Sequence, residues 1–109
     1  MDPRLPALAD QLLLIERELR RLGWWASVAP EVERLASREP FCVDTLALEE
    51  WLQWVLLPRM KVLVEQGSGL PANCAIRPMA EQVWGAEGAR VAVLLALLAE
   101  FDRLLSATA

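Results

Sequence analysis

The sequence predicts an all-α protein: a single-domain helical bundle of about four to five helices. Three observations lead to this fold class. Apolar residues recur at steps of three and four near both ends of the chain, no alternating strand pattern of useful length appears, and 55% of the 109 residues are hydrophobic. A chain of this length and composition can bury one core, so we expect one domain over residues 1–109.

The first expected helix covers residues 4–23. Pro3 and Pro6 suit its opening turn, and Gly23 suits its C-terminal end, because glycine lacks a Cβ and adopts the left-handed conformation readily. Mostly charged residues separate its apolar positions. Those apolar positions are Leu8, Leu12, Ile15, Leu19 and Leu22.

A short second helix is expected over residues 31–36, with Pro30 in its first turn and a connector over residues 37–40. The long third helix then begins. Asp44 or Thr45 can cap it, since both side chains carry an oxygen that accepts a hydrogen bond from an unpaired backbone amide.

The third helix is the most apolar and should occupy the centre of the core. Pro58 lies in its interior, where the missing donor and the contact of the ring with the Trp54 carbonyl cost about 3 kcal/mol in a regular helix. We therefore predict a kink near Pro58, between Trp54 and Pro58. The helix ends at Gly67, and a loop of about ten residues leads to Pro78.

Two further helices complete the expected bundle. A short fourth helix opens at Pro78 and continues through Trp84. The last helix follows after residues 85–88, and the first and last helices should both pack on the third. Its apolar positions are Val91, Leu94, Leu95, Leu98, Phe101 and Leu105.

The residue inventory excludes several kinds of catalytic and metal site. The chain has no histidine, which excludes a Ser-His-Asp triad, a histidine-ligated zinc site and the Glu-x-x-His pattern of di-iron bundles. The only two cysteines, Cys42 and Cys74, cannot supply a closed four-ligand zinc site. We predict no catalytic residues, no metal and no cofactor, and we do not expect an enzyme.

Charge and hydropathy limit the partners and the location. The net charge is −4 with the acids spread along the chain, which argues against direct binding of duplex nucleic acid. The longest uncharged run near the C-terminal end, residues 91–99, is far shorter than the roughly 18 residues needed to span a bilayer. No secretory signal is recognised at the start, so the expected location is the cytoplasm, without membrane association.

Candidate binding residues cluster around the expected kink and the end of the first helix. A kink can expose one face of Trp54, and Arg59 could bond carbonyls freed by Pro58 or pair with Asp44 or Glu50. Core packing is the alternative for the tryptophans, and a structural role is the alternative for Arg59. The full candidate set is Trp24, Trp25, Asp44, Glu50, Gln53, Trp54, Arg59 and Arg77.

The central segment resembles the YqcC-like family of small bacterial proteins. The residues that carry the resemblance are Pro40-Phe41, Asp44-Thr45, Glu50-Trp51-Leu52-Gln53-Trp54-Val55-Leu56, Pro58-Arg59-Met60 and Leu70-Pro71. The resemblance covers nearly the whole chain and implies a helical bundle, bacterial origin and a cytoplasmic location. Members are often encoded beside a tRNA pseudouridine synthase, which implies RNA modification as a setting.

Two classes of function follow as hypotheses. The leading one is a protein–protein interaction module or accessory factor, which presents the kinked third helix and the 67–78 loop to a protein partner or to a second copy. An accessory of a tRNA-modifying pseudouridine synthase is a variant of it, because an acidic chain suits a protein partner better than RNA. The alternative is a pocket for a small anion, weakly catalytic or not, with Trp54 as a wall and Arg59 or Arg77 as the cation.

Overall fold

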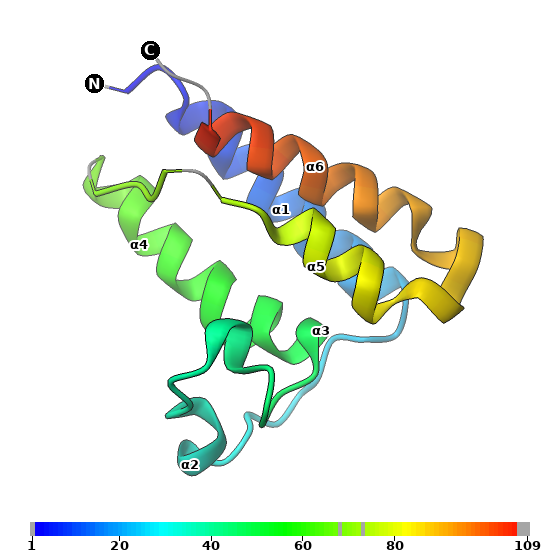
Figure 1. Ribbon diagram of the computed structural model, residues 1–109. Coiled ribbons are helices and arrows are strands. Elements are labelled where there is room, and N and C mark those ends of the chain that lie inside the picture. Colours follow the sequence, from blue (N-terminus) through cyan, green and yellow to red (C-terminus); the bar gives the residue numbers. More distant parts are fainter. Residues whose placement is uncertain (1, 68, 73, 107–109) are drawn as a thin grey trace.

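The computed structural model describes residues 2–67, 69–72 and 74–106 and confirms the all-α prediction (Figure 1). Within that part of the chain every regular element is helical. The elements are α1 (Leu5–Arg21), α2 (Val32–Leu35), a 3-10 turn (Pro40–Cys42), α3 (Leu48–Trp51), a π-helical turn (Leu52–Leu56), α4 (Leu57–Gln66), α5 (Ile76–Val83), a second 3-10 turn (Gly85–Val91) and α6 (Ala92–Ser106).

The helices α1 and α6 lie side by side in opposite directions, so the start of α1 and the end of α6 lie at the same end of the bundle (Figure 1). The helix α4 packs against α1, as predicted, but the last helix does not lie along the third. Its neighbours are α1 and α5. The reason is connectivity: only the turn Gly85–Val91 joins α5 to α6, and such short connections favour antiparallel neighbours.

The first helix matches its prediction closely. Its five expected apolar positions are all buried, and it ends where Gly23 takes a left-handed φ of 77°. The Trp24 amide then donates to the Leu19 carbonyl over 2.9 Å, which satisfies one of the carbonyls left unpaired at the helix end.

The predicted start of the third helix is wrong. The helix α3 begins at Leu48, and neither Asp44 nor Thr45 caps it. Its first turn is closed instead by Glu50, whose Oε1 accepts a hydrogen bond of 2.9 Å from the backbone amide of Ala47. A 3-10 turn over Pro40–Cys42 precedes the helix, and the helix begins later in the sequence than predicted.

The predicted irregularity near Pro58 takes the form of a π-helical turn. The amide of Leu57 donates to the carbonyl of Leu52, five residues back. This wider turn comes directly before Pro58, at the point where the ring would press on the Trp54 carbonyl in a regular α-helix. The chain then continues as α4 and ends at Gly67, with a φ of 74°, as predicted. Ser68 and Asn73 of the predicted loop lie outside the described residues.

The fourth helix begins two residues earlier than predicted, at Ile76 instead of Pro78. A carboxylate from another helix explains the shift. Asp102 of α6 accepts hydrogen bonds from the amides of Ile76 at 3.0 Å and Arg77 at 2.9 Å. These two donors at the start of α5 would otherwise lack an intrahelical partner.

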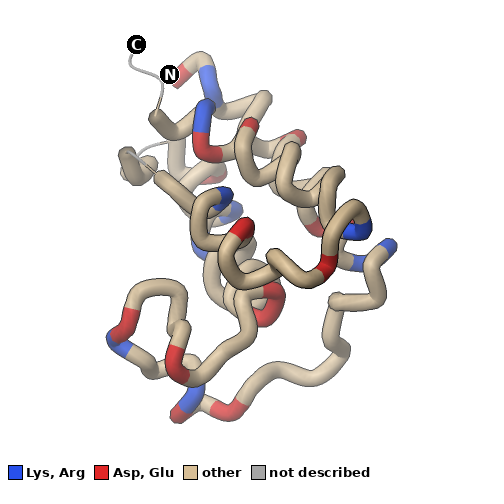
Figure 2. Tube along the Cα trace, turned by 45° about the vertical axis from the view of Figure 1, so that its right-hand side comes forward, with Lys and Arg blue, Asp and Glu red and all other residues tan. Residues whose placement is uncertain are grey.

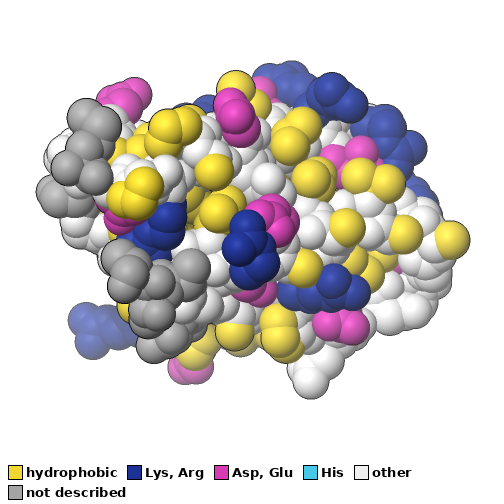
Figure 3. Space-filling model, turned by 90° about the horizontal axis from the view of Figure 1, so that it is seen from above, with side chains coloured by type: hydrophobic (Ala, Val, Ile, Leu, Met, Phe, Trp, Pro, Cys, Tyr) yellow, Lys and Arg dark blue, Asp and Glu magenta, His cyan; other side chains and the backbone are white. Residues whose placement is uncertain are grey.

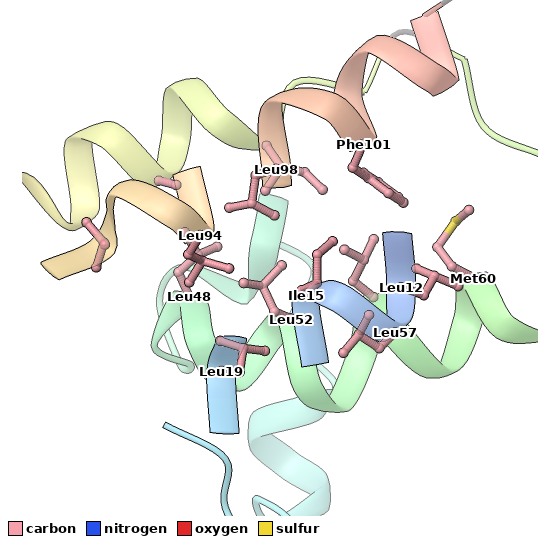
Figure 4. Packing of buried hydrophobic residues seen from close by; sticks show 14 of the residues in the cluster. Leu12, Ile15, Leu19, Leu48, Leu52, Leu57, Met60, Leu94, Leu98 and Phe101 are labelled. Atoms are coloured by element: carbon pink, nitrogen blue, oxygen red, sulfur yellow. The ribbon is translucent and has the colours of Figure 1, made fainter. Parts of the chain in front are cut away.

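The core is made mainly of aliphatic side chains from α1, the central segment (residues 48–66, which comprise α3, the π-helical turn and α4), α5 and α6 (Figure 4). Phe101 and Leu98 of α6 and Ile15 of α1 are completely buried. A buried polar side chain joins two helices at the edge of this core. Gln11 of α1 donates to the Leu97 carbonyl of α6 over 2.7 Å.

Charged residues of opposite sign lie close together over the surface (Figures 2 and 3). On the face seen in Figure 3, hydrophobic side chains are interspersed among them without forming one large apolar patch. In the described part of the chain, no helix combines the length and the apolar character that crossing a membrane requires.

Candidate binding pocket

A pocket of about 560 Å³ lies between three segments of the chain, a size within the range of ligand-binding sites. The 35–42 segment and the central residues 51–63 each form one wall, and the described residues of 69–71 and 74–76 form the third. The described residues that line it are Leu35, Ser37, Glu39, Pro40, Phe41, Cys42, Trp51, Val55, Leu56, Arg59, Met60, Leu63, Gly69, Pro71, Cys74, Ala75 and Ile76. The surface that the sequence assigned to a partner therefore contains a real concavity.

The pocket is lined mainly by apolar side chains. Phe41 meets Trp51 edge to face, with ring centroids 4.9 Å apart and planes at 69°. The π-helical turn brings Val55 and Leu56 to the same wall. Both aromatic rings are only partly buried, so they are accessible to an incoming apolar group.

The backbone is strained where it passes the pocket. Phe41 and Cys42 have φ values of 59° and 50°, in the left-handed region that residues with a Cβ rarely adopt. Backbone hydrogen bonds hold the turn in place: Cys42 donates to the Glu39 carbonyl at 3.0 Å and accepts from the Leu46 amide at 2.8 Å. Strain of this kind gathers at functional sites.

A second, smaller pocket of about 120 Å³ shares Phe41 with the first. Its lining residues are Phe41, Val43, Leu46, Ala47, Leu48, Met79 and Val83. Val43 is 52% exposed and Val83 is 45% exposed. The apolar surface thus continues past Phe41 on both sides of its ring.

Among the described residues, Arg59 is the one cation that lines the larger pocket, and its side chain is exposed. It makes no hydrogen bond or ion pair with the part of the chain that the structure describes. The proposed pairing with Asp44 or Glu50 does not occur. Asp44 accepts from the Ser37 hydroxyl at 2.5 Å, and Glu50 pairs with Arg34 at 2.9 Å.

Glu50 and Gln53, two of the predicted binding residues, are used inside the fold. The Arg34–Glu50 pair is reinforced by Thr45, whose hydroxyl donates to the Arg34 carbonyl at 2.7 Å. The buried Gln53 side chain donates to the Ala26 carbonyl at 2.7 Å and accepts from the Ala26 amide at 2.8 Å. These contacts join α2 and the segment that precedes it to the central segment of the chain.

Trp54 and Arg77 do not line either of the two pockets that share Phe41. The Trp54 side chain is partly buried, and its indole N–H is buried without a hydrogen-bond partner among the described residues. Arg77 lies within 3.4 Å of Glu81, one turn along α5. The pocket wall that the sequence assigned to Trp54 is formed by Trp51.

Trp24 and Trp25 lie at the far end of α1 and are both partly buried. Trp24 packs against Trp84, with centroids 5.1 Å apart. The guanidinium of Arg20 lies 4.5 Å from the centre of the Trp25 ring. Neither tryptophan lines the pockets at Phe41.

The sequence did not single out Phe41, Cys42 or Cys74 as site residues, yet all three line the larger pocket. A Pro-Phe-Cys run gives no signal for two consecutive left-handed residues, which glycine usually supplies. Partial burial and the negative charge of Asp102 raise the pKa of the Cys74 thiol to about 11. Cys74 is therefore a neutral thiol at neutral pH.

The family model, a solved structure and related sequences all place the chain in the same family. Residues 7–104 match the model of the DUF446 family, whose description reads tRNA pseudouridine synthase C. The solution NMR structure of protein YqcC from Escherichia coli superposes with a TM-score of 0.86, covering 99% of this chain and 92% of that one at 32% identity. The Escherichia coli K12 sequence called uncharacterized protein YqcC is 36% identical over 94 residues, 86% of each chain.

Two further relatives match over a shorter segment of 64 residues, 59% of this chain. An uncharacterized protein of Haemophilus influenzae Rd is 47% identical, and the segment spans 60% of its length. A protein of Pectobacterium carotovorum called tRNA pseudouridine synthase C is 53% identical, and there the segment spans only 17% of the length.

Proposed function

The chain belongs to the DUF446 family of YqcC-like proteins, and from that premise we propose that it is a protein-binding accessory module of a tRNA pseudouridine synthase. The surface that meets the enzyme is the one around the pocket at Phe41, formed by the 35–42 segment, the central residues 51–63 and residues 69–71 and 74–76. In this role the chain contributes binding energy and leaves catalysis to its partner.

The observation that carries the proposal is the relative from Pectobacterium. A segment 53% identical to this chain makes up 17% of a longer protein called tRNA pseudouridine synthase C. When such a segment occurs within the polypeptide of an enzyme, a separate copy of it can be expected to bind that enzyme. This supports a protein partner of the synthase type for the present chain.

The charge distribution supports contact with the enzyme in preference to the tRNA. Eight of the eleven basic side chains form ion pairs with acids of the same chain. A phosphate-binding surface needs several clustered cations free to contact the backbone, and the net charge of −4 works against it.

The direct test is sedimentation of the purified chain with the tRNA pseudouridine synthase C of the same bacterium, in three runs: the two proteins, the chain with tRNA, and the chain alone. We expect a complex with the enzyme and none with tRNA. The chain alone reports whether it pairs with a second copy. Binding to tRNA without binding to the enzyme would overturn the proposal.

A second candidate function is a pocket for a small organic anion, supported by Arg59 as an unpaired cation beside apolar walls. Melting curves recorded with decanoate, an amphipathic carboxylate, test this candidate, because a ligand that binds the folded state raises the melting temperature. A rise that disappears in Arg59→Gln would support it, and an unchanged melting temperature would exclude decanoate-like anions.

A further inference from the structure

The two pockets that meet at Phe41 have the shape of a site for two neighbouring side chains. Phe41 lines both a pocket of about 560 Å³ and one of about 120 Å³. The larger volume admits an aromatic or long aliphatic side chain, and the smaller one admits a short aliphatic side chain. Protein segments that dock in grooves use such paired anchors, placed close together in their sequence.

The surface between and around the pockets favours a protein segment over a compact ligand. The exposed side chains of Val43 and Val83 line the smaller cavity and present apolar area to solvent. A small molecule held in the larger cavity would leave these valines in water. A bound segment would cover them and exclude water around its anchors, as the rim of an interface does.

The charged side chains that line the larger pocket indicate which charge a bound segment should carry. Arg59 lines the larger pocket and has no hydrogen bond or ion pair among the described residues, so its guanidinium is available for a carboxylate. Glu39 also lines this pocket and forms no ion pair in the described part of the chain. An acidic group on the partner is therefore favoured near Arg59 and disfavoured near Glu39.

We propose that the paired pockets bind a segment of the partner with two bulky apolar side chains close in sequence and an acidic residue that contacts Arg59. This inference rests on the proposed function, since the segment is taken to belong to the enzyme. It adds the chemistry of the contact, which the family comparison does not supply.

The experiment uses overlapping peptides that cover the tRNA pseudouridine synthase C of the same bacterium, with binding to the full chain followed by fluorescence anisotropy. We expect the bound peptides to share two bulky apolar residues within one helical turn and an Asp or Glu beside them. Arg59→Glu should weaken binding by at least about tenfold, and a lysine in place of the acidic residue of the peptide should restore it. Glu39→Gln should leave binding unchanged or make it tighter.

The matched control is Arg17→Glu, because Arg17 is also exposed but lies on α1, away from the pockets. Unfolding curves of each variant exclude loss of fold as the cause. If the intact enzyme binds and neither Arg59→Glu nor Phe41→Ala weakens it, the accessory role stands, whereas the assignment of the binding surface to the Phe41 pocket and this inference are both overturned. If neither enzyme nor peptides bind, both are overturned. Stabilisation by decanoate with no peptide bound would assign the pocket to a small molecule and overturn the inference.

Discussion

Arg59 lies close to the π-helical turn, but its side chain makes no hydrogen bond or ion pair with the described residues. The sequence suggested that it might bond carbonyls released by Pro58, but the π-helical turn pairs Leu57 with Leu52 and Arg59 makes no such bond. Its side chain is exposed beside a pocket. This exposed position fits the binding role proposed for Arg59 and gives it no structural contact among the described residues.

This leads to a first prediction. Arg59→Glu should change the free energy of unfolding by less than about 0.5 kcal/mol, because exposed side chains away from caps and buried networks contribute little. Urea denaturation followed by circular dichroism measures it. A loss well above 1 kcal/mol would mean that Arg59 is structural, and its use as a binding probe would then fail.

The second prediction concerns the thiol of Cys74. Its pKa is raised from 9.0 to about 11 because burial and the Asp102 charge both disfavour the thiolate. At about pH 8 the reactive thiolate should be about 100-fold scarcer than in the unfolded chain. Alkylation by iodoacetamide should be correspondingly slow and should accelerate as the pH rises toward 11.

Peptide-level mass spectrometry separates the products at Cys74 and Cys42 in this experiment. The same chain in concentrated urea is the reference for an unperturbed thiol. Rapid modification of Cys74 in the folded protein at about pH 8 would contradict the described burial of this thiol.

At the scale of the elements, α5 depends on a residue that is distant in sequence. The amides of Ile76 and Arg77 both donate to the Asp102 carboxylate. No local signal could reveal this cap, because periodicity and proline position both act over a few residues. The start of α5 was therefore misplaced by two residues, while the start and end of α1, which depend on local prolines and glycine, were predicted well.

The cap gives the third prediction. Asp102→Ala should lower the free energy of unfolding by about 1–2 kcal/mol, and Asp102→Asn should lower it less because an amide oxygen can still accept one bond. Glu100→Ala is the control on the same helix, since Glu100 makes only an exposed pair with Arg103. Equal effects of the two alanine substitutions would contradict the capping role.

A fourth prediction concerns Gln53, which the sequence placed among the binding residues. Its side chain makes two hydrogen bonds to the backbone of Ala26 and is buried. Gln53→Ala should lower the free energy of unfolding by about 1–3 kcal/mol, because it removes both of these hydrogen bonds together with a buried side chain. Amide hydrogen exchange at Ala26 should accelerate in the variant, and slow exchange there would show that Gln53 does not hold this segment.

At the scale of the whole molecule, the sequence predicted the fold class, the boundaries of the first helix and the central irregularity from helical periodicity and one proline. It did not predict the neighbours of α6, because periodicity defines which face of a helix is buried but not against which helix. The lining of the pocket was predicted only in part, through Arg59, for a similar reason. It depends on the left-handed Phe41 and Cys42, which bring a distant turn beside the central helix.

The central claim is that the surface around Phe41 and Arg59 binds a tRNA pseudouridine synthase. The most direct measurement is a calorimetric titration of the tRNA pseudouridine synthase C of the same bacterium with the wild-type chain, Arg59→Glu and Arg17→Glu. We predict one saturable binding event that Arg17→Glu preserves and Arg59→Glu weakens by at least about tenfold. Absence of binding by the correctly folded wild-type chain would contradict the claim.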